Sequence, residues 1–148
     1  MTIYIGSDHN GFYYKNKLVG YLTNQGHLVV DCGDQTLDPG DDFPKFASEV
    51  VLRLLADRDH DSRAILICGS GQGMCMAANR YKGIRASLCW NNAEAFSARN
   101  DDDANVLCLS ASQHSYREVT RIINVWLSTP FAGAPRYVRR IKQLDKLG

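Results

Sequence analysis

The fold is predicted from one stretch of sequence, Ala64-Ile65-Leu66-Ile67-Cys68-Gly69-Ser70-Gly71-Gln72-Gly73-Met74. Its first five residues are an unbroken apolar run, too short for a helix, which is typical of a strand buried on both faces of a parallel sheet. Three glycines in five positions then predict a tight turn, and apolar residues follow at helical spacing. A strand, a glycine-rich turn and a helix start form a corner whose free backbone N–H groups can bind an anion.

Cys68 occupies the last position of this predicted strand and faces the corner. A thiol beside unpaired N–H groups is expected to have a lowered pKa and to react as a thiolate. The alternative is an inert cysteine at the end of a buried strand, since free cysteines are commonly buried. We expect a reactive site here, and the inert alternative stays open.

Three familiar motifs do not fit the spacing of this turn. The dinucleotide fingerprint needs G-x-G-x-x-G and an acidic residue about 20 positions later, whereas the glycines here run G-x-G-x-G and no acid stands in that region. A P-loop needs Gly-Lys-Ser/Thr, a triplet that the sequence lacks. A cysteine-dependent phosphatase loop would carry Arg at the position of Met74.

Composition narrows the class of protein further. A chain of 148 residues is most simply one domain, residues 1–148, and its net charge of +1 gives no support for nucleic-acid or membrane binding. Five cysteines, an odd number without any C-x-x-C pair, argue against a disulfide framework and against a zinc site. The N-terminus reads as a strand rather than a signal peptide, so a reducing cytoplasm fits best.

One acidic loop is a candidate for a metal site. It carries five aspartates, of which Asp41 and Asp42 stand last, but nothing in their spacing fixes a ligand geometry. A solvated acidic loop is therefore favoured over a metal site. We expect neither a metal nor a cofactor.

Strands alternate with helical patterns along the whole chain. This predicts a doubly wound α/β domain of three layers, with a five-stranded parallel sheet and an extra C-terminal helix. The predicted strands are residues 3–5, 28–30, 64–68, 84–89 and 105–109. With the Rossmann-like order 2-1-3-4-5, the ligand crevice lies between the first and third strands. The turns Asp8-His9 and Cys68-Gly69-Ser70 then meet there in one site.

Two further groups of polar residues lie elsewhere. The turn Asp101-Asp102-Asp103 joins a helix to a strand, so it belongs to the opposite edge of its own sheet from Cys68. Arg136 and Arg140, four residues apart, share one stripe of the last predicted helix. Each group either is a solvated surface or reaches the crevice of a neighbouring subunit.

With these residues identified, the chain resembles the ribose-5-phosphate isomerase B family, which includes galactose-6-phosphate isomerase subunits. Gly6-Ser7-Asp8-His9-Asn10-Gly11-Phe12 is similar to the family's G-x-D-x-x-G-F opening. Ile67–Met74, Ala77-Ala78-Asn79 and Gly83-Ile84-Arg85 resemble its central signature, and Arg136 and Arg140 match its C-terminal arginine pair. Several blocks in the right order make this resemblance more specific than any one glycine-rich loop.

The resemblance implies interconversion of aldose and ketose phosphates without a metal, in dimers or tetramers with shared active sites. It implies that Cys68 is the base that moves a proton between C2 and C1. Ser70 and the N–H groups of Gly69, Gly71 and Gly73 would stabilise an enediolate. Asp8 would orient the sugar oxygens. His9, Arg136 and Arg140 would hold the phosphate.

Four departures from the family pattern surround this predicted pocket. Asp101 and Asp102 stand where the family has His-Asn, and that His is its ring-opening acid/base. Asp101 is accordingly placed with the catalytic candidates and Asp102 with the substrate-binding ones. Tyr137 replaces a His, Ser112 an Arg and Phe43 a Tyr. Two hypotheses follow: a sugar-phosphate isomerase whose substrate is shifted from ribose 5-phosphate, or a non-catalytic sugar-phosphate-binding partner of a catalytic paralogue.

Overall fold

Strands and helices alternate from the first residues onward in the computed structural model, which describes residues 1–148. The strands are β1 (Thr2–Ser7), β2 (Leu28–Asp31), β3 (Arg63–Cys68), β4 (Ala86–Leu88) and β5 (Val106–Ser110). The helices are α1 (Phe12–Asn24), α2 (Phe43–Ala56), α3 (Gln72–Ala78), α4 (Asn92–Asn100), α5 (Tyr116–Ser128) and α6 (Pro135–Leu144), and the 3-10 turn η1 (His9–Gly11) precedes α1. All strand pairs are parallel, which confirms the predicted fold class.

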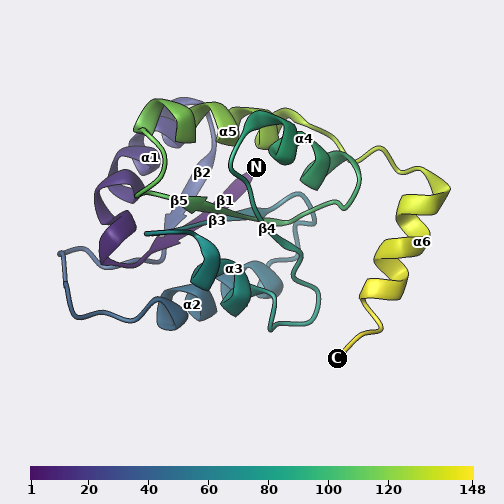
Figure 1. The fold of residues 1–148 in the computed structure, drawn as a ribbon, viewed down its shortest axis with the longest axis horizontal. Helices are drawn as coiled ribbons and strands as arrows, with labels where there is room; N and C mark the ends of the chain where they lie inside the picture. Colours follow the sequence, from purple (N-terminus) through teal and green to yellow (C-terminus); the bar gives the residue numbers. More distant parts are fainter.

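Alternate residues of β3 face two different layers of helices. Ile65 and Ile67 pack into a core shared with α1, α4 and α5, whereas Ala64, Leu66 and Cys68 pack toward α2 and α3. All six residues of β3 are buried, as its unbroken apolar run predicts. Figure 1 shows the two helical layers above and below the sheet. The register of β3 therefore directs Cys68 toward α2 and α3.

The strand order is β2-β1-β3-β5-β4, so the predicted order 2-1-3-4-5 is wrong at one edge. β5 lies inside the sheet with all five residues buried, and β4 is a three-residue edge strand, shorter than predicted, whose residues are half-buried. The physical reason is the difference in apolar content. The β5 sequence VLCLS gains more from burial on both faces of the sheet than the β4 sequence ASL does.

This order also decides where α4 lies. The chain moves outward from β3 to the edge strand β4 and then back inward to β5. Because both crossovers are right-handed but run in opposite directions across the sheet, their helices lie on opposite faces. Accordingly α3 packs with α2, while Ala95 and Ala98 of α4 share the other core with α5. The reversal between β1 and β3, where the crevice is predicted, is unaffected by the exchange of the two strands.

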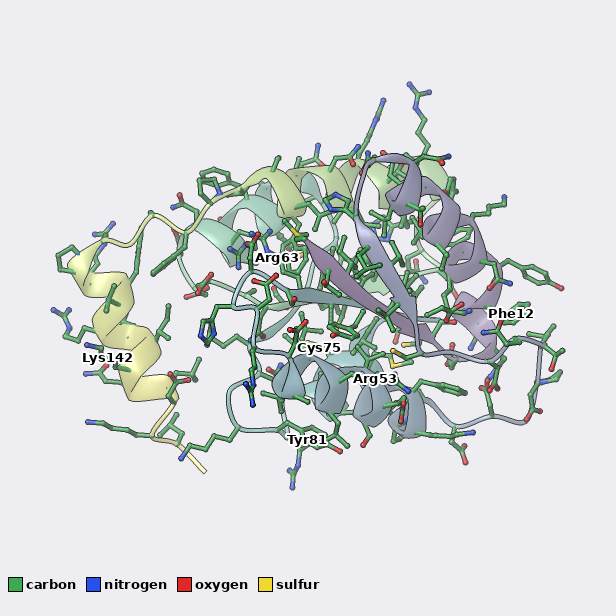
Figure 2. All side chains as sticks on the ribbon, turned by 180° about the vertical axis from the view of Figure 1, so that it is seen from behind. Phe12, Arg53, Arg63, Cys75, Tyr81 and Lys142 are labelled. Carbon is green, nitrogen blue, oxygen red and sulfur yellow. The ribbon has the colours of Figure 1, made fainter.

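Helix α6 stands apart from both layers. Figure 1 shows it beyond the edge of the domain, and Figure 2 shows it from behind, marked by Lys142. None of its residues is buried; Val138 and Ile141 are half-buried, and Leu144 is exposed. Its apolar stripe is thus uncovered within one chain. No helix of this protein has both the length and the apolar character that crossing a membrane requires.

Candidate active site

The Cys68 sulfur lies where β3 meets the glycine-rich turn. It accepts a hydrogen bond from the Gly71 N–H at 3.1 Å, and the residue is only 5% exposed. Burial is the largest influence on this thiol and raises its pKa, although backbone N–H groups of Met74, Gly71 and Ser70 act in the opposite direction. The predicted lowering of the Cys68 pKa is therefore wrong for the single chain. The turn does supply N–H donors, but the loss of water around the sulfur outweighs them.

The turn itself depends on glycine at two positions. Gly71 has φ +78°, and a Cβ there would lie 2.5 Å from Leu88 Cδ1 and 3.0 Å from the Leu109 carbonyl oxygen. At Gly73 a Cβ would lie 2.8 Å from Cζ of Phe43, so the aromatic ring rests against the backbone of the turn. Side chains at either position would push the turn away from its neighbours.

Three loops meet at Gly69. A Cβ on Gly69 would lie 3.3 Å from Asn10 Nδ2 and 3.4 Å from Ser112 Oγ. Asn10 follows β1 and Ser112 follows β5, so residues after β1, β3 and β5 share one end of the sheet. Ser70 lies at the exposed surface of this end, where its hydroxyl accepts a hydrogen bond from the Gln72 N–H at 3.3 Å. The predicted meeting of the two corners is confirmed as a juxtaposition of loops.

Asp8 begins the turn after β1 and is 7% exposed. Its Oδ1 accepts hydrogen bonds from the Asn10 N–H at 2.9 Å and the Gly11 N–H at 3.2 Å, which caps η1. Burial is the main influence and raises the pKa of Asp8. The carboxylate is close enough to Cys68 to raise the pKa of that thiol as well. The acid and the thiol therefore belong to the same small region.

His9 is held by a carboxylate from a distant loop. Oδ1 of Asp41 accepts hydrogen bonds from the His9 backbone N–H at 3.0 Å and from Nδ1 of the ring at 2.7 Å. The hydrogen bond to Asp41 is the largest influence and raises the pKa of His9. Asp41 is thus paired rather than solvated, as is Asp31, which accepts a hydrogen bond from Lys15 Nζ at 2.6 Å. No group of three or more His, Cys, Asp or Glu side chains is arranged to hold a metal ion.

The remaining predicted residues lie at the other end of the sheet. Along the β3–β5 pair, Cys68 is in register with Ser110 and Ala64 with Val106, so about 13 Å of strand separates the two ends. Asp101 and Asp102 precede β5 at the far end, and neither joins Cys68 within this chain. The expectation that the Asp101 turn lies at the opposite edge from Cys68 is confirmed.

The Asp101 turn and the arginines of α6 form a second cluster. Tyr137 and, more weakly, Asp101 raise the pKa of Arg136, and burial raises the pKa of Asp102 while Arg140 acts to lower it. Arg136 and Arg140 are both exposed. The four residues are therefore brought near one another, but on the side of the sheet away from the thiol.

Two arginines fix the shape of this turn. Arg85 donates to the Asp102 and Asp103 carbonyl oxygens at 3.0 Å and 3.1 Å, and Arg99 donates to the Asp103 carboxylate at 2.8 Å. Asp103 has φ +49°, a left-handed conformation that these contacts stabilise. Sequence analysis did not identify either arginine as a positioning residue, because the pairing is visible only when the loop is folded.

Sequence analysis also missed two residues at the crevice. Asp41 was grouped with a solvated loop, and Phe43 was noted only as a departure from the resemblance. The end of this loop and the start of α2 border the crevice, since Asp41 contacts His9 and Phe43 contacts Gly73. The acid-rich composition of the loop carried no signal that distinguishes Asp41 from its neighbours.

A doubly wound sheet with a thiol, a glycine-rich turn and a His–Asp pair at its switch point has the arrangement typical of a small-molecule site. Comparison with known proteins gives the family. Residues 3–144 match the model of the family described as Ribose/Galactose Isomerase. The chain belongs to this family, and it is an isomerase.

Named relatives match over nearly the whole chain. The probable ribose-5-phosphate isomerase B of Mycoplasma pneumoniae is 41% identical, with 96% of this chain and 91% of the relative aligned. A crystal structure of ribose-5-phosphate isomerase B from Mycoplasma genitalium with bound ribulose-5-phosphate is 39% identical, with a TM-score of 0.93 over 98% and 94% of the two chains. The enzyme of that name from Thermotoga maritima is 40% identical, with a TM-score of 0.92 over 99% and 98%.

Proposed function

We propose that this protein interconverts the aldose and ketose forms of a sugar phosphate through a cis-enediolate, with Cys68 as the base. The observation that carries the proposal is the position of the Cys68 sulfur. It ends β3 at the switch point, accepts the Gly71 N–H at 3.1 Å and lies near Asp8. A relative of 39% identity holds ribulose-5-phosphate in its crystal structure, so five-carbon sugar phosphates are the first substrates to test.

The proposed reaction needs no redox partner. The Cys68 thiolate removes the proton from C2 of the aldose, the electron pair forms the C1–C2 double bond, and O1 becomes negative. The proton of the O2 hydroxyl moves to O1, and the thiol then returns its proton to C1 as the carbonyl forms at C2. The N–H groups of the Gly69–Gly73 turn and the Ser70 hydroxyl stabilise the charge of the intermediate. Asp8 orients the sugar hydroxyls through the carboxylate oxygen that does not cap η1.

A second copy of the chain completes the proposed site. Asp101 and Asp102 lie at the end of the sheet opposite Cys68 in their own subunit, with Arg136 and Arg140 near them, and α6 leaves its apolar stripe uncovered. In a homodimer or homotetramer these residues reach the crevice of the neighbour. There the arginines bind the phosphate together with His9, Asp102 contacts the substrate, and Asp101 serves in ring opening.

Turnover by the purified protein tests this function directly. We expect interconversion within a panel of tetrose, pentose and hexose phosphates, with solvent deuterium entering the carbon that receives the proton, which is C1 of the ketose or C2 of the aldose. Cys68→Ala should lower turnover and exchange by at least about 10³-fold while substrate still binds, because only the base is removed. Cys89→Ala removes a buried thiol from the other helical layer and should keep activity. Substrate binding without turnover of any sugar phosphate by the wild type would favour the non-catalytic subunit instead.

A further inference from the structure

The pairing of Asp41 with His9 is the contact at the crevice that the reaction scheme leaves unexplained. One oxygen, Oδ1, accepts both the backbone N–H at 3.0 Å and ring Nδ1 at 2.7 Å, so the turn and the ring are fixed together. The Asp41 side chain is 8% exposed and that of His9 is 32% exposed. A carboxylate buried this far requires a paired charge or donors, and His9 supplies two donors.

The Asp41–His9 pair lies beside the proposed substrate crevice. His9 follows Asp8 directly in the turn after β1, and the loop that brings Asp41 also lays Phe43 against Gly73. The pair therefore lies at the first corner of the crevice, and the segment that carries Asp41 also reaches the second corner through Phe43. Ser112 supplies a hydroxyl near Gly69, where the resemblance leads one to expect an arginine. The imidazole is thus the group on this turn that can carry positive charge.

Hydrogen-bond chemistry limits what His9 can then do. A carboxylate only accepts, so the contact with Asp41 requires the proton on Nδ1. If the ring is neutral, Nε2 presents a lone pair, which cannot bind a phosphate oxygen. If the ring is an imidazolium, Nε2–H becomes a charge-assisted donor. Phosphate binding by His9 in this arrangement therefore requires the charged ring.

We propose that Asp41 is a positioning residue that keeps His9 in the imidazolium form and directs its Nε2–H to the phosphate of the substrate. This inference rests on the proposed function, in which His9 binds that phosphate. The charged groups around the ring all favour the cation: Asp41 first, then Asp8 on the same turn and Asp38 on the loop, with burial opposing them. The pairing with Asp41 raises the pKa of His9, so the charged ring persists to higher pH.

Asp41→Asn tests the proposal, since the amide oxygen can accept both hydrogen bonds while the charge is removed. Proton NMR of the full-length protein follows the His9 ring, assigned by its loss in His9→Gln. We expect the His9 pKa to fall in Asp41→Asn, and inorganic phosphate to shift the His9 resonance less at pH 7.5. Substrate KM at that pH should rise on the order of tenfold with kcat little changed, and the difference should shrink at lower pH.

Asp38→Asn is the matched control, because Asp38 is exposed, its carboxylate accepts a hydrogen bond only from the Gly40 N–H at 3.0 Å, and it acts on His9 through space. It should change the His9 titration much less. An unchanged His9 pKa in Asp41→Asn overturns the inference even if the enzyme is an active isomerase. If Asp41→Asn does not fold, a wild-type His9 that titrates at or below about 6.5, the value for free histidine, overturns it too. Absence of turnover by the wild type counts against the proposed function alone, because the NMR titration needs no substrate.

Discussion

At the scale of single residues, Cys68 and Cys75 belong to the same core, but the main influence on the thiol pKa differs between them. Burial raises the pKa of Cys68, whereas a hydrogen bond from the buried Cys108 thiol lowers the pKa of Cys75 to about 7. Figure 2 shows Cys75 beneath the sheet. The more acidic thiol is thus not the one at the crevice. A catalytic role for Cys68 therefore depends on its position, and on positive charge that a second subunit would bring near it.

Alkylation by iodoacetamide across a pH series distinguishes these two thiols. The thiolate is the reacting form, so the rate at Cys75 should level off above pH 7, near its pKa of about 7. The rate at Cys68 should still rise with pH beyond that point, because its pKa is raised. Peptide mass spectrometry reports each site separately, so different access to the two sulfurs changes the absolute rate and not the pH at which it levels off. A Cys68 rate that levels off first would contradict the assigned influences.

Asp101 bears on substrate choice at the same scale. Ring opening needs a positioned acid/base, and imidazole exchanges protons at neutral pH better than a carboxylic acid does. We predict that the wild type favours four-carbon sugar phosphates, which have little cyclic form, over ribose 5-phosphate. Asp101→His should then raise kcat/KM for ribose 5-phosphate more than for the four-carbon substrate, measured side by side.

Two outcomes would redirect this prediction. If Asp101 itself opens the ring, Asp101→Asn should impair only the cyclic substrates, and the carboxylate becomes the acid/base. If the wild type turns over ribose 5-phosphate as well as any alternative, the idea of a shifted substrate is wrong. The half-buried Asp101 accepts a hydrogen bond from Asn100 Nδ2 at 2.7 Å, so Asn100→Ala controls for loss of that contact alone.

At the scale of elements, the turn between β3 and α3 is expected to tolerate little change. Gly71→Ala forces a left-handed backbone and a Cβ 3.0 Å from the Leu109 carbonyl oxygen. We predict a loss of roughly 2 kcal/mol or more in the free energy of unfolding. Gly20→Ala in the middle of α1 meets nothing within 4 Å and should add up to about 1 kcal/mol. Urea unfolding of both variants measures the difference, and equal effects would show that the turn is not constrained.

The sequence predicted the elements that local chemistry determines. The apolar run of β3, the capping box of Ser115 and Glu118, and Pro44 in the first turn of α2 all stand where the pattern put them. The order of β4 and β5 was wrong, because it follows from a comparison of burial between two strands. The Cys68 pKa was wrong because adjacent N–H groups are visible in sequence, whereas the depth of burial is a property of the folded chain.

In the candidate site, too, residues that follow adjacent strands were easier to predict than a residue on a distant loop. Asp8, Cys68 and the glycines lie together because they follow adjacent parallel strands, a relation that topology alone supplies. The contact of Asp41 with His9 spans 32 positions through an irregular loop, and no periodicity or spacing predicts it. Residues on regular elements were therefore predictable, and the loop residue that contacts them was not.

At the scale of the whole molecule, the two ends of the sheet carry complementary groups. One end holds Cys68, Asp8 and His9, and the other holds the Asp101 turn beside Arg136 and Arg140. In the proposed homodimer, an isologous pairing would place the second end of each copy at the first end of the other. In that arrangement each crevice needs Cys68 from one subunit and Arg140 from its partner.

Mixing two inactive variants tests this arrangement. Cys68→Ala lacks the base and Arg140→Ala lacks a phosphate contact, so neither homodimer should have normal activity. In a hybrid dimer one crevice carries both defects and the other carries neither. Equal amounts, unfolded and refolded together, give hybrids as half of all dimers, so about one quarter of wild-type activity should return. Mixing Cys68→Ala with Asp8→Ala is the control, because both residues lie at the same end of one subunit and each crevice of the hybrid keeps one defect. If native mass spectrometry finds the hybrid dimers and no activity returns, Arg140 acts within its own subunit or not at all, and the shared site is wrong.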